Sequence, residues 1–125
     1  MADRENNRIQ IFDYGGKYLD QWTDTLGPTT LFTDPENTLY VPELSLLCKD
    51  YKPVPPTMTI RPRVSIYNSD RRLVARWPRY LSGEQRSDAP GNFIAPHCVW
   101  CDSHGDLYVG ECFEGSRIQK FVRRD

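Results

Sequence analysis

Three short stretches share one pattern: RIQIF (Arg8–Phe12), RVSIY (Arg63–Tyr67) and RIQKF (Arg117–Phe121). Each begins with arginine, continues with a β-branched residue and ends with an aromatic ring. The copies begin 55 and then 54 residues apart, and self-similarity at a nearly fixed period marks a repeat architecture. The chain is therefore predicted to contain repeated structural units.

A second motif, two short apolar runs around a turn, lies between these copies at Leu31–Val41 and again at Val99–Val109. The first two arginine copies also continue through a polar turn into a run that ends at Trp22 or Trp77. Short runs of alternating apolar and polar residues predict half-buried strands. Repeated units of four such strands predict an all-β fold, a partial β-propeller of about two to three antiparallel blades. A β-sandwich is the alternative, which we favour less because two different motifs recur in the same order.

The phase of the repeat divides the chain into a half blade (1–22), a blade (28–77) with an inserted loop (45–62), and a blade lacking its last strand (91–125). We expect two, four and three strands in these units. The inserted loop contains several prolines, which oppose regular strand or helix. A propeller needs about four or more blades. The sequence therefore predicts a fragment, or association with a second copy or a missing half.

Composition argues against some classes of partner. A hydrophobic fraction of 38%, a charged fraction of 26% and a net charge of −1 provide no general attraction to nucleic acid or anionic lipid. No run approaches the length of a membrane span, and the charged N-terminus is unlike a signal peptide. Four cysteines without the spacing of a disulfide framework favour a reducing, cytoplasmic location.

Cys98 and Cys101 form a CxxC pair, a spacing used in zinc and redox sites. Side chains three positions apart on a strand point to opposite faces of the sheet. We therefore predict that both are small buried hydrophobic residues. Cys48 and Cys112 have no partner that the sequence identifies.

The repeat resembles NHL-repeat propellers, and more narrowly the later blades of the peptidyl-α-hydroxyglycine α-amidating lyases and their bacterial relatives. The resemblance lies in ADRENNRIQIF (Ala2–Phe12), APHCVWCDSHGDLYVGE (Ala95–Glu111) and SRIQKF (Ser116–Phe121). It covers most of the chain outside the inserted loop and the linker between the last two units.

This resemblance implies a carbon–nitrogen lyase that cleaves a peptidyl-α-hydroxyglycine to a peptide amide and glyoxylate. It implies that His97, in a Pro-His pair, is a zinc ligand and that Arg4 is an active-site residue acting on an anionic substrate group. Cys98 stands where the family has an aspartate associated with calcium, which argues against calcium. A catalytic zinc needs about three protein ligands. The other histidine, His104, lies in a predicted hairpin turn, so the catalytic site is expected to be incomplete in this chain.

A non-catalytic NHL module that binds a protein or another ligand is the alternative function. Metal discriminates the two: the lyase requires zinc at His97, whereas a module would contact its partner through surface loops and would be indifferent to a chelator. A third expectation is that the isolated chain has no chemistry of its own.

Overall fold

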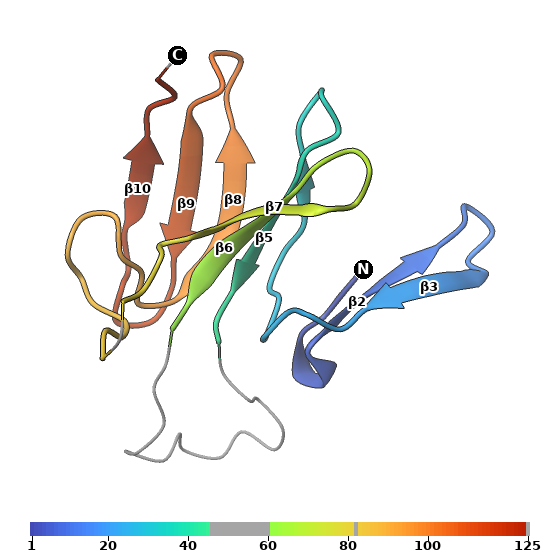
Figure 1. Ribbon diagram of the computed structural model, residues 1–125, viewed down its shortest axis with the longest axis horizontal. Coiled ribbons are helices and arrows are strands. Elements are labelled where there is room, and N and C mark those ends of the chain that lie inside the picture. The colour runs from blue at the N-terminus through green and yellow to red at the C-terminus, as the bar shows by residue number, and fades with distance from the viewer. Residues whose placement is uncertain (46–60, 82, 125) are drawn as a thin grey trace.

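The computed structural model describes residues 1–45, 61–81 and 83–124, which form three small antiparallel sheets (Figure 1). Sheet A contains β1 (Ala2–Asp3), β2 (Arg8–Phe12) and β3 (Tyr18–Trp22), with a 3₁₀ turn, η1 (Arg4–Asn6), between the first two. Sheet B contains β4 (Phe32–Thr33), β5 (Leu39–Glu43), β6 (Arg63–Tyr67) and β7 (Leu73–Trp77). Sheet C contains β8 (Pro96–Cys101), β9 (Leu107–Glu111) and β10 (Ile118–Phe121). The predicted all-β fold is confirmed.

The predicted strand count was wrong for residues 1–22, which contain three strands rather than two. Ala2 pairs with Ile9 and Asp3 with Arg8, so the N-terminal residues form β1. A strand of two residues followed at once by a turn is too short to show alternation in the sequence. Most of the predicted 45–62 loop, residues 46–60, lies outside the described part of the chain.

The same hairpin turn connects β4 to β5 and β8 to β9. The Asp34 carboxylate accepts hydrogen bonds from the backbone N–H of Glu36 (2.9 Å) and Thr38 (2.8 Å) and from the Tyr40 hydroxyl (3.2 Å). Asp102 accepts the three corresponding bonds in sheet C. A short acidic side chain that satisfies the backbone of its own turn favours a tight connection. The sequence repeat is thus also a repeat of individual hydrogen bonds.

A carboxylate–arginine pair links neighbouring strands at the same end of each sheet. The pairs are Asp3–Arg8 (2.7 Å), Glu43–Arg63 (2.8 Å) and Glu111–Arg117 (2.5 Å). The side chains of Glu43 and Glu111 are fully buried, whereas that of Asp3 is 20% exposed. Each arginine is the first residue of its RIQIF-like motif, so this position joins the end of one strand to the start of the next.

The hydrophobic core lies between the sheets. One cluster joins sheets A and B, and a second joins sheets B and C. The first consists of Ile9, Trp22, Leu31, Leu39, Val41 and Tyr67. The second consists of Phe32, Tyr40, Val64, Ile66, Trp77, Phe93, Val99, Cys101, Leu107, Val109 and Phe121.

Sheet B therefore uses both faces for packing. We call its face toward sheet C, with Val64 and Ile66, the leading face, and its face toward sheet A, with Val41 and Tyr67, the trailing face. The same names apply to the equivalent faces of sheets A and C. Successive side chains of a strand point to opposite faces of the sheet. Apolar residues at successive positions, such as Ile66 and Tyr67, therefore contribute to both interfaces.

Candidate functional site

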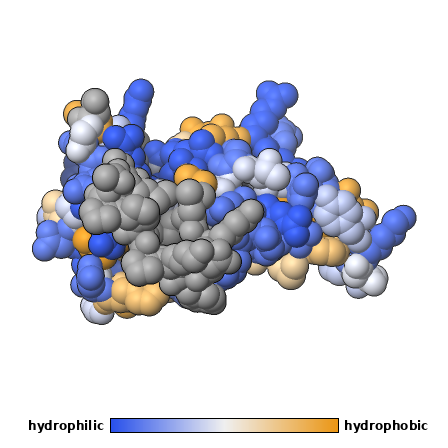
Figure 2. Space-filling model, turned by 90° about the horizontal axis from the view of Figure 1, so that it is seen from below, coloured by the Kyte–Doolittle hydropathy of each residue, from blue (hydrophilic) through white to orange (hydrophobic). Residues whose placement is uncertain are grey.

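The two residues predicted to act together, His97 and Arg4, belong to elements at one end of the sheets. His97 is the second residue of β8, which begins at the lower end of sheet C in Figure 1, and Arg4 opens η1, at the lower end of sheet A. The Thr30 hydroxyl donates a hydrogen bond to the His97 carbonyl (3.2 Å), which ties the start of β8 to the segment before β4. Seen from below, this end of the molecule is mostly hydrophilic with separate small apolar areas (Figure 2).

His97 lines a hollow of about 560 Å³ on sheet C. The other lining residues are Cys98, Gly110, Glu111, Cys112, Ser116, Arg117 and Ile118. The hollow thus brings together an imidazole, two thiols, a hydroxyl, the Glu111–Arg117 ion pair and the apolar side chain of Ile118. Its volume lies within the range of about 300–1,000 Å³ usual for small-molecule sites, but fewer of its lining side chains are hydrophobic or aromatic than in theirs.

Glu111 is fully engaged in holding the fold. Its carboxylate accepts hydrogen bonds from the backbone N–H of Ile94 (2.6 Å) and Ala95 (3.2 Å), from the Gln119 amide (3.0 Å) and from Arg117 (2.5 Å). Both carboxylate oxygens are thus occupied by contacts that hold the segment before β8 and strand β10 to the end of β9. We assign Glu111 a structural role.

Arg117 is similarly occupied. Besides Glu111, its guanidinium donates to the backbone carbonyls of Asp88 and, at 2.9 Å, Asn92. These bonds fasten the linker before β8 to the end of sheet C. Arg117 therefore leaves little donor capacity for a ligand.

The two thiols of the hollow differ in environment. The Cys112 thiol lies 3.8 Å from the Ala95 carbonyl. Burial raises its pKa, while a backbone hydrogen bond and, less strongly, the Arg4 guanidinium lower it in part. Cys98 is exposed, so the prediction that it is a buried small hydrophobic residue was wrong. It points across the sheet to Gly110, where an added Cβ would lie only 2.5 Å from the Cys98 Sγ.

Cys101 does not share the hollow with Cys98. It lines a second hollow of about 1020 Å³ between the hairpin turns of sheets B and C. The predicted separation of the CxxC side chains on opposite faces is thus observed. Cys48 lies outside the described residues.

Arg4 acts electrostatically on a residue of the hollow that His97 lines. It forms an ion pair with Glu5 (3.2 Å), while Asp3 pairs with Arg8 instead. Its effect on the pKa of Cys112 is the electrostatic link between η1 and the hollow that contains His97. Arg4 follows the paired carboxylate of sheet A just as Cys112 follows Glu111 in sheet C, a correspondence that the repeat pattern could have revealed.

The described residues contain no group of three or more histidine, cysteine, aspartate or glutamate side chains arranged to hold a metal ion. His104 lies in the β8–β9 turn with 85% of its side chain exposed, as predicted. His97 is therefore the single histidine at the candidate site, and its role as a zinc ligand stays a prediction.

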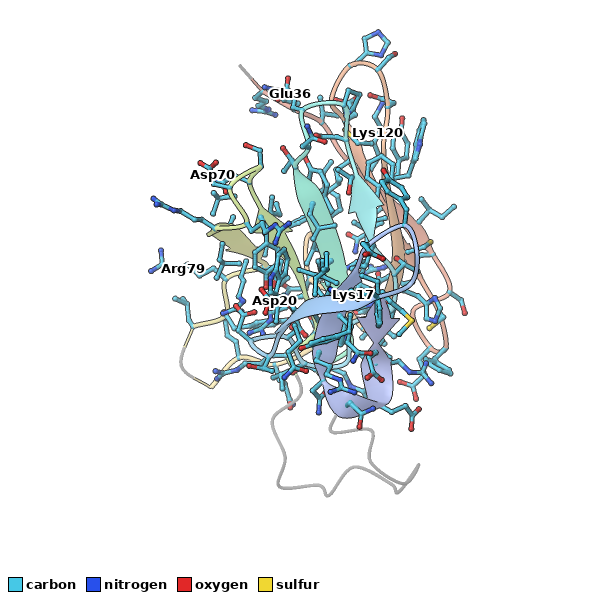
Figure 3. All side chains as sticks on the ribbon, turned by 90° about the vertical axis from the view of Figure 1, so that its right-hand side faces the viewer. Lys17, Asp20, Glu36, Asp70, Arg79 and Lys120 are labelled. Atoms are coloured by element: carbon cyan, nitrogen blue, oxygen red, sulfur yellow. The ribbon has the colours of Figure 1, made fainter. Side chains whose placement is uncertain are left out.

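The larger hollow lies at the opposite end of the sheets. Its lining includes Tyr40, Trp77, Cys101, His104, Phe121 and Arg123. Glu36, from the β4–β5 turn, also lines this hollow and is labelled at the top of Figure 3. Burial raises the pKa of Tyr40 to about 12, with Asp34 adding to the shift. The sequence motifs did not single out this hollow, because its walls come from residues that the repeat uses for packing.

Among the described residues, no helix is long and apolar enough to cross a membrane. None of the protein-family models matches the chain, and no curated protein matches it either.

Proposed function

We propose that the chain is part of an NHL-type, lyase-like propeller and that its His97 hollow binds the anionic end of a small peptide-like ligand. The observation that carries the proposal is the hollow itself, which places the His97 imidazole beside two thiols and a hydroxyl. The charge of Arg4 acts on one of those thiols, Cys112, against the larger effect of burial. Arg4 belongs to the turn between β1 and β2, and His97 belongs to β8. The resemblance independently assigns Arg4 and His97 to one site.

Arg4 would supply the recognition of charge. A guanidinium presents a rigid fork of N–H donors that fits a carboxylate, and such charge-assisted bonds are stronger than neutral ones. Arg117 is already bonded to Glu111 and two carbonyls, and the resemblance gives the recognition of the anionic group to Arg4. The His97 ring would contact a neutral or metal-bound oxygen of the same ligand.

The test is ligand binding followed by NMR, using a short peptide that ends in α-hydroxyglycine and the same peptide ending in an amide. We expect the acid to bind and Arg4→Ala to weaken it roughly 10- to 100-fold, which corresponds to the loss of one charged hydrogen bond. Arg72→Ala, at an exposed arginine in the β6–β7 turn, is the matched control and should change nothing. Equal binding of acid and amide, or an unaffected Arg4→Ala variant, would contradict the proposal.

A zinc-assisted lyase is the second candidate, favoured by the Pro96-His97 pair. Zinc would polarise a substrate oxygen as a Lewis acid, with His97 as one ligand. Zinc content and glyoxylate release should then fall together in His97→Ala, whereas a binding module would take up the acid peptide equally well with chelator present. Stoichiometric zinc that survives His97→Ala would remove His97 from the metal site.

A further inference from the structure

Equivalent positions of the three sheets differ sharply in exposure on the leading face. The second residue of the RIQIF-like motif is 2% exposed at Ile9 and 0% at Val64, but 76% exposed at Ile118. Ile9 is covered by sheet B and Val64 by sheet C. Ile118 has the same place in sheet C, and no further sheet of the described residues covers it.

The aromatic residues of the leading face repeat this contrast. Phe32 and Tyr40 of sheet B form a ring pair with centroids 6.2 Å apart, and both belong to the core shared with sheet C. Trp100 and Tyr108 form the corresponding pair in sheet C at 5.6 Å, yet Trp100 is 54% exposed. The leading face of sheet C thus has the composition of an interface that lacks a partner among the described residues.

The trailing face of sheet A is also uncovered, as the aromatic residue that ends each RIQIF-like motif shows. The last residue of the motif is 3% exposed at Tyr67, where Trp22 of the preceding sheet packs on it at 5.0 Å. Phe121 likewise meets Trp77 at 3.7 Å. Phe12 holds the same place in sheet A, but it is 37% exposed. Among the ring pairs of the described residues it contacts only Tyr18 of its own sheet, at 6.0 Å.

We propose that the leading face of sheet C binds the trailing face of sheet A of a second copy of this chain. Within the chain, a leading face packs on a trailing face twice, and the described residues leave one of each uncovered. Figure 1 shows these two sheets at opposite ends of the row. A second copy is therefore the partner whose leading and trailing faces already pack on each other in this way. Beside Phe12, the trailing face of sheet A carries Gln10 and its cross-strand partner Gln21.

The charges on the leading face do not oppose this contact. Lys120, its charged residue on β10, pairs with Asp106 at 2.8 Å and lies 5.2 Å from the centre of the Tyr108 ring. Burial of a charge is costly mainly when the charge is unpaired. Lys120 would enter the interface with its counter-charge already in place.

Because the two faces differ, the contact is head-to-tail. A head-to-tail contact closes into a ring if the rotation permits and otherwise forms an open chain. A face-to-face dimer through two copies of sheet C is the competing arrangement, and it would not use Phe12.

The experiment measures the mass of the purified chain by light scattering and sedimentation over a wide range of concentrations, with Ile118→Lys, Phe12→Lys and Val74→Lys beside it. Circular dichroism checks that each variant folds. Val74 is the matched control, because it is 57% exposed although both faces of its sheet are packed. The wild-type chain and Val74→Lys should associate beyond the monomer mass of 14.5 kDa. Each of the other two variants should weaken association at least about tenfold, the equivalent of about 1.4 kcal/mol.

Mixing the variants identifies the geometry. Ile118→Lys retains an intact sheet A and Phe12→Lys retains an intact sheet C, so an equimolar mixture should form one heterodimer. A wild-type chain that stays monomeric at every concentration overturns the proposal, as does association that survives Ile118→Lys. Association lost in Ile118→Lys but kept in Phe12→Lys would show the face-to-face dimer instead and would equally overturn it.

Discussion

Removing an arginine from one of the repeated carboxylate–arginine pairs should cost much more in sheet B than in sheet A. The Glu43 side chain is fully buried, and its carboxylate accepts hydrogen bonds from the Leu26 N–H (2.8 Å), from Arg63 (2.9 Å) and from the Ser65 hydroxyl. Replacing Arg63 with methionine retains most of the apolar stem but leaves a buried charge without its counter-ion. Breaking a buried pair in this way costs about 3–5 kcal/mol, and the 21% exposure of the Arg63 side chain places the expected cost near the lower value.

The equivalent change in sheet A should be mild. The Asp3 and Arg8 side chains are 20% and 33% exposed. Water can therefore solvate Asp3 when the guanidinium is lost, and exposed pairs contribute about 0–1 kcal/mol. Arg8→Met is thus the matched control for Arg63→Met, with the same motif position and the same chemical change.

Urea unfolding followed by circular dichroism would measure both costs, with equal slopes showing that the change lies in stability. The double variant Glu43→Gln with Arg63→Met should recover part of the loss, because no unpaired charge remains buried. The reasoning is refuted if Arg8→Met destabilises the chain as much as Arg63→Met does, or if Arg63→Met costs less than about 1 kcal/mol.

Three other expectations concern packing and turns. Trp77→Ala should lower the free energy of unfolding by about 3 kcal/mol, since Trp77 packs on two aromatic rings. Trp100→Ala, measured in a solution dilute enough to keep the chain monomeric, should change it by about 0.5 kcal/mol or less. Urea unfolding measures both values. Asp34→Ala should cost roughly 1–2 kcal/mol by removing three hydrogen bonds from one turn, measured in the same way. Burial, reinforced by a nearby aspartate, raises the pKa of Tyr40 and Tyr67 from 10.0 to about 12. Their contribution to stability should be complete below pH 10 and lost as the pH rises toward 12, which phenolate absorbance and unfolding at alkaline pH would reveal; early titration of both rings would contradict it.

The sequence by itself determined the all-β class and the position of most strands. Alternation and turn residues act over a few neighbouring positions, so their effects are visible along the chain. The ends of β3 and β7 at Trp22 and Trp77 and the turn made by Asp102 are examples. Strand β1 was not predicted, because two residues are too few to show the alternation of a strand and because β1 forms by pairing with β2.

Tertiary structure alone decided which equivalent residues are buried. Ile9 and Ile118 occupy the same motif position, yet one is in the core and the other is exposed. Cys98 likewise appeared apolar and buried from its strand, but no sheet of the described residues covers its face. The burial of Glu111 and the effect of Arg4 on Cys112 also arise between segments distant in the sequence. Burial and electrostatic environment depend on which other surfaces approach a residue, and local sequence carries no information about that approach.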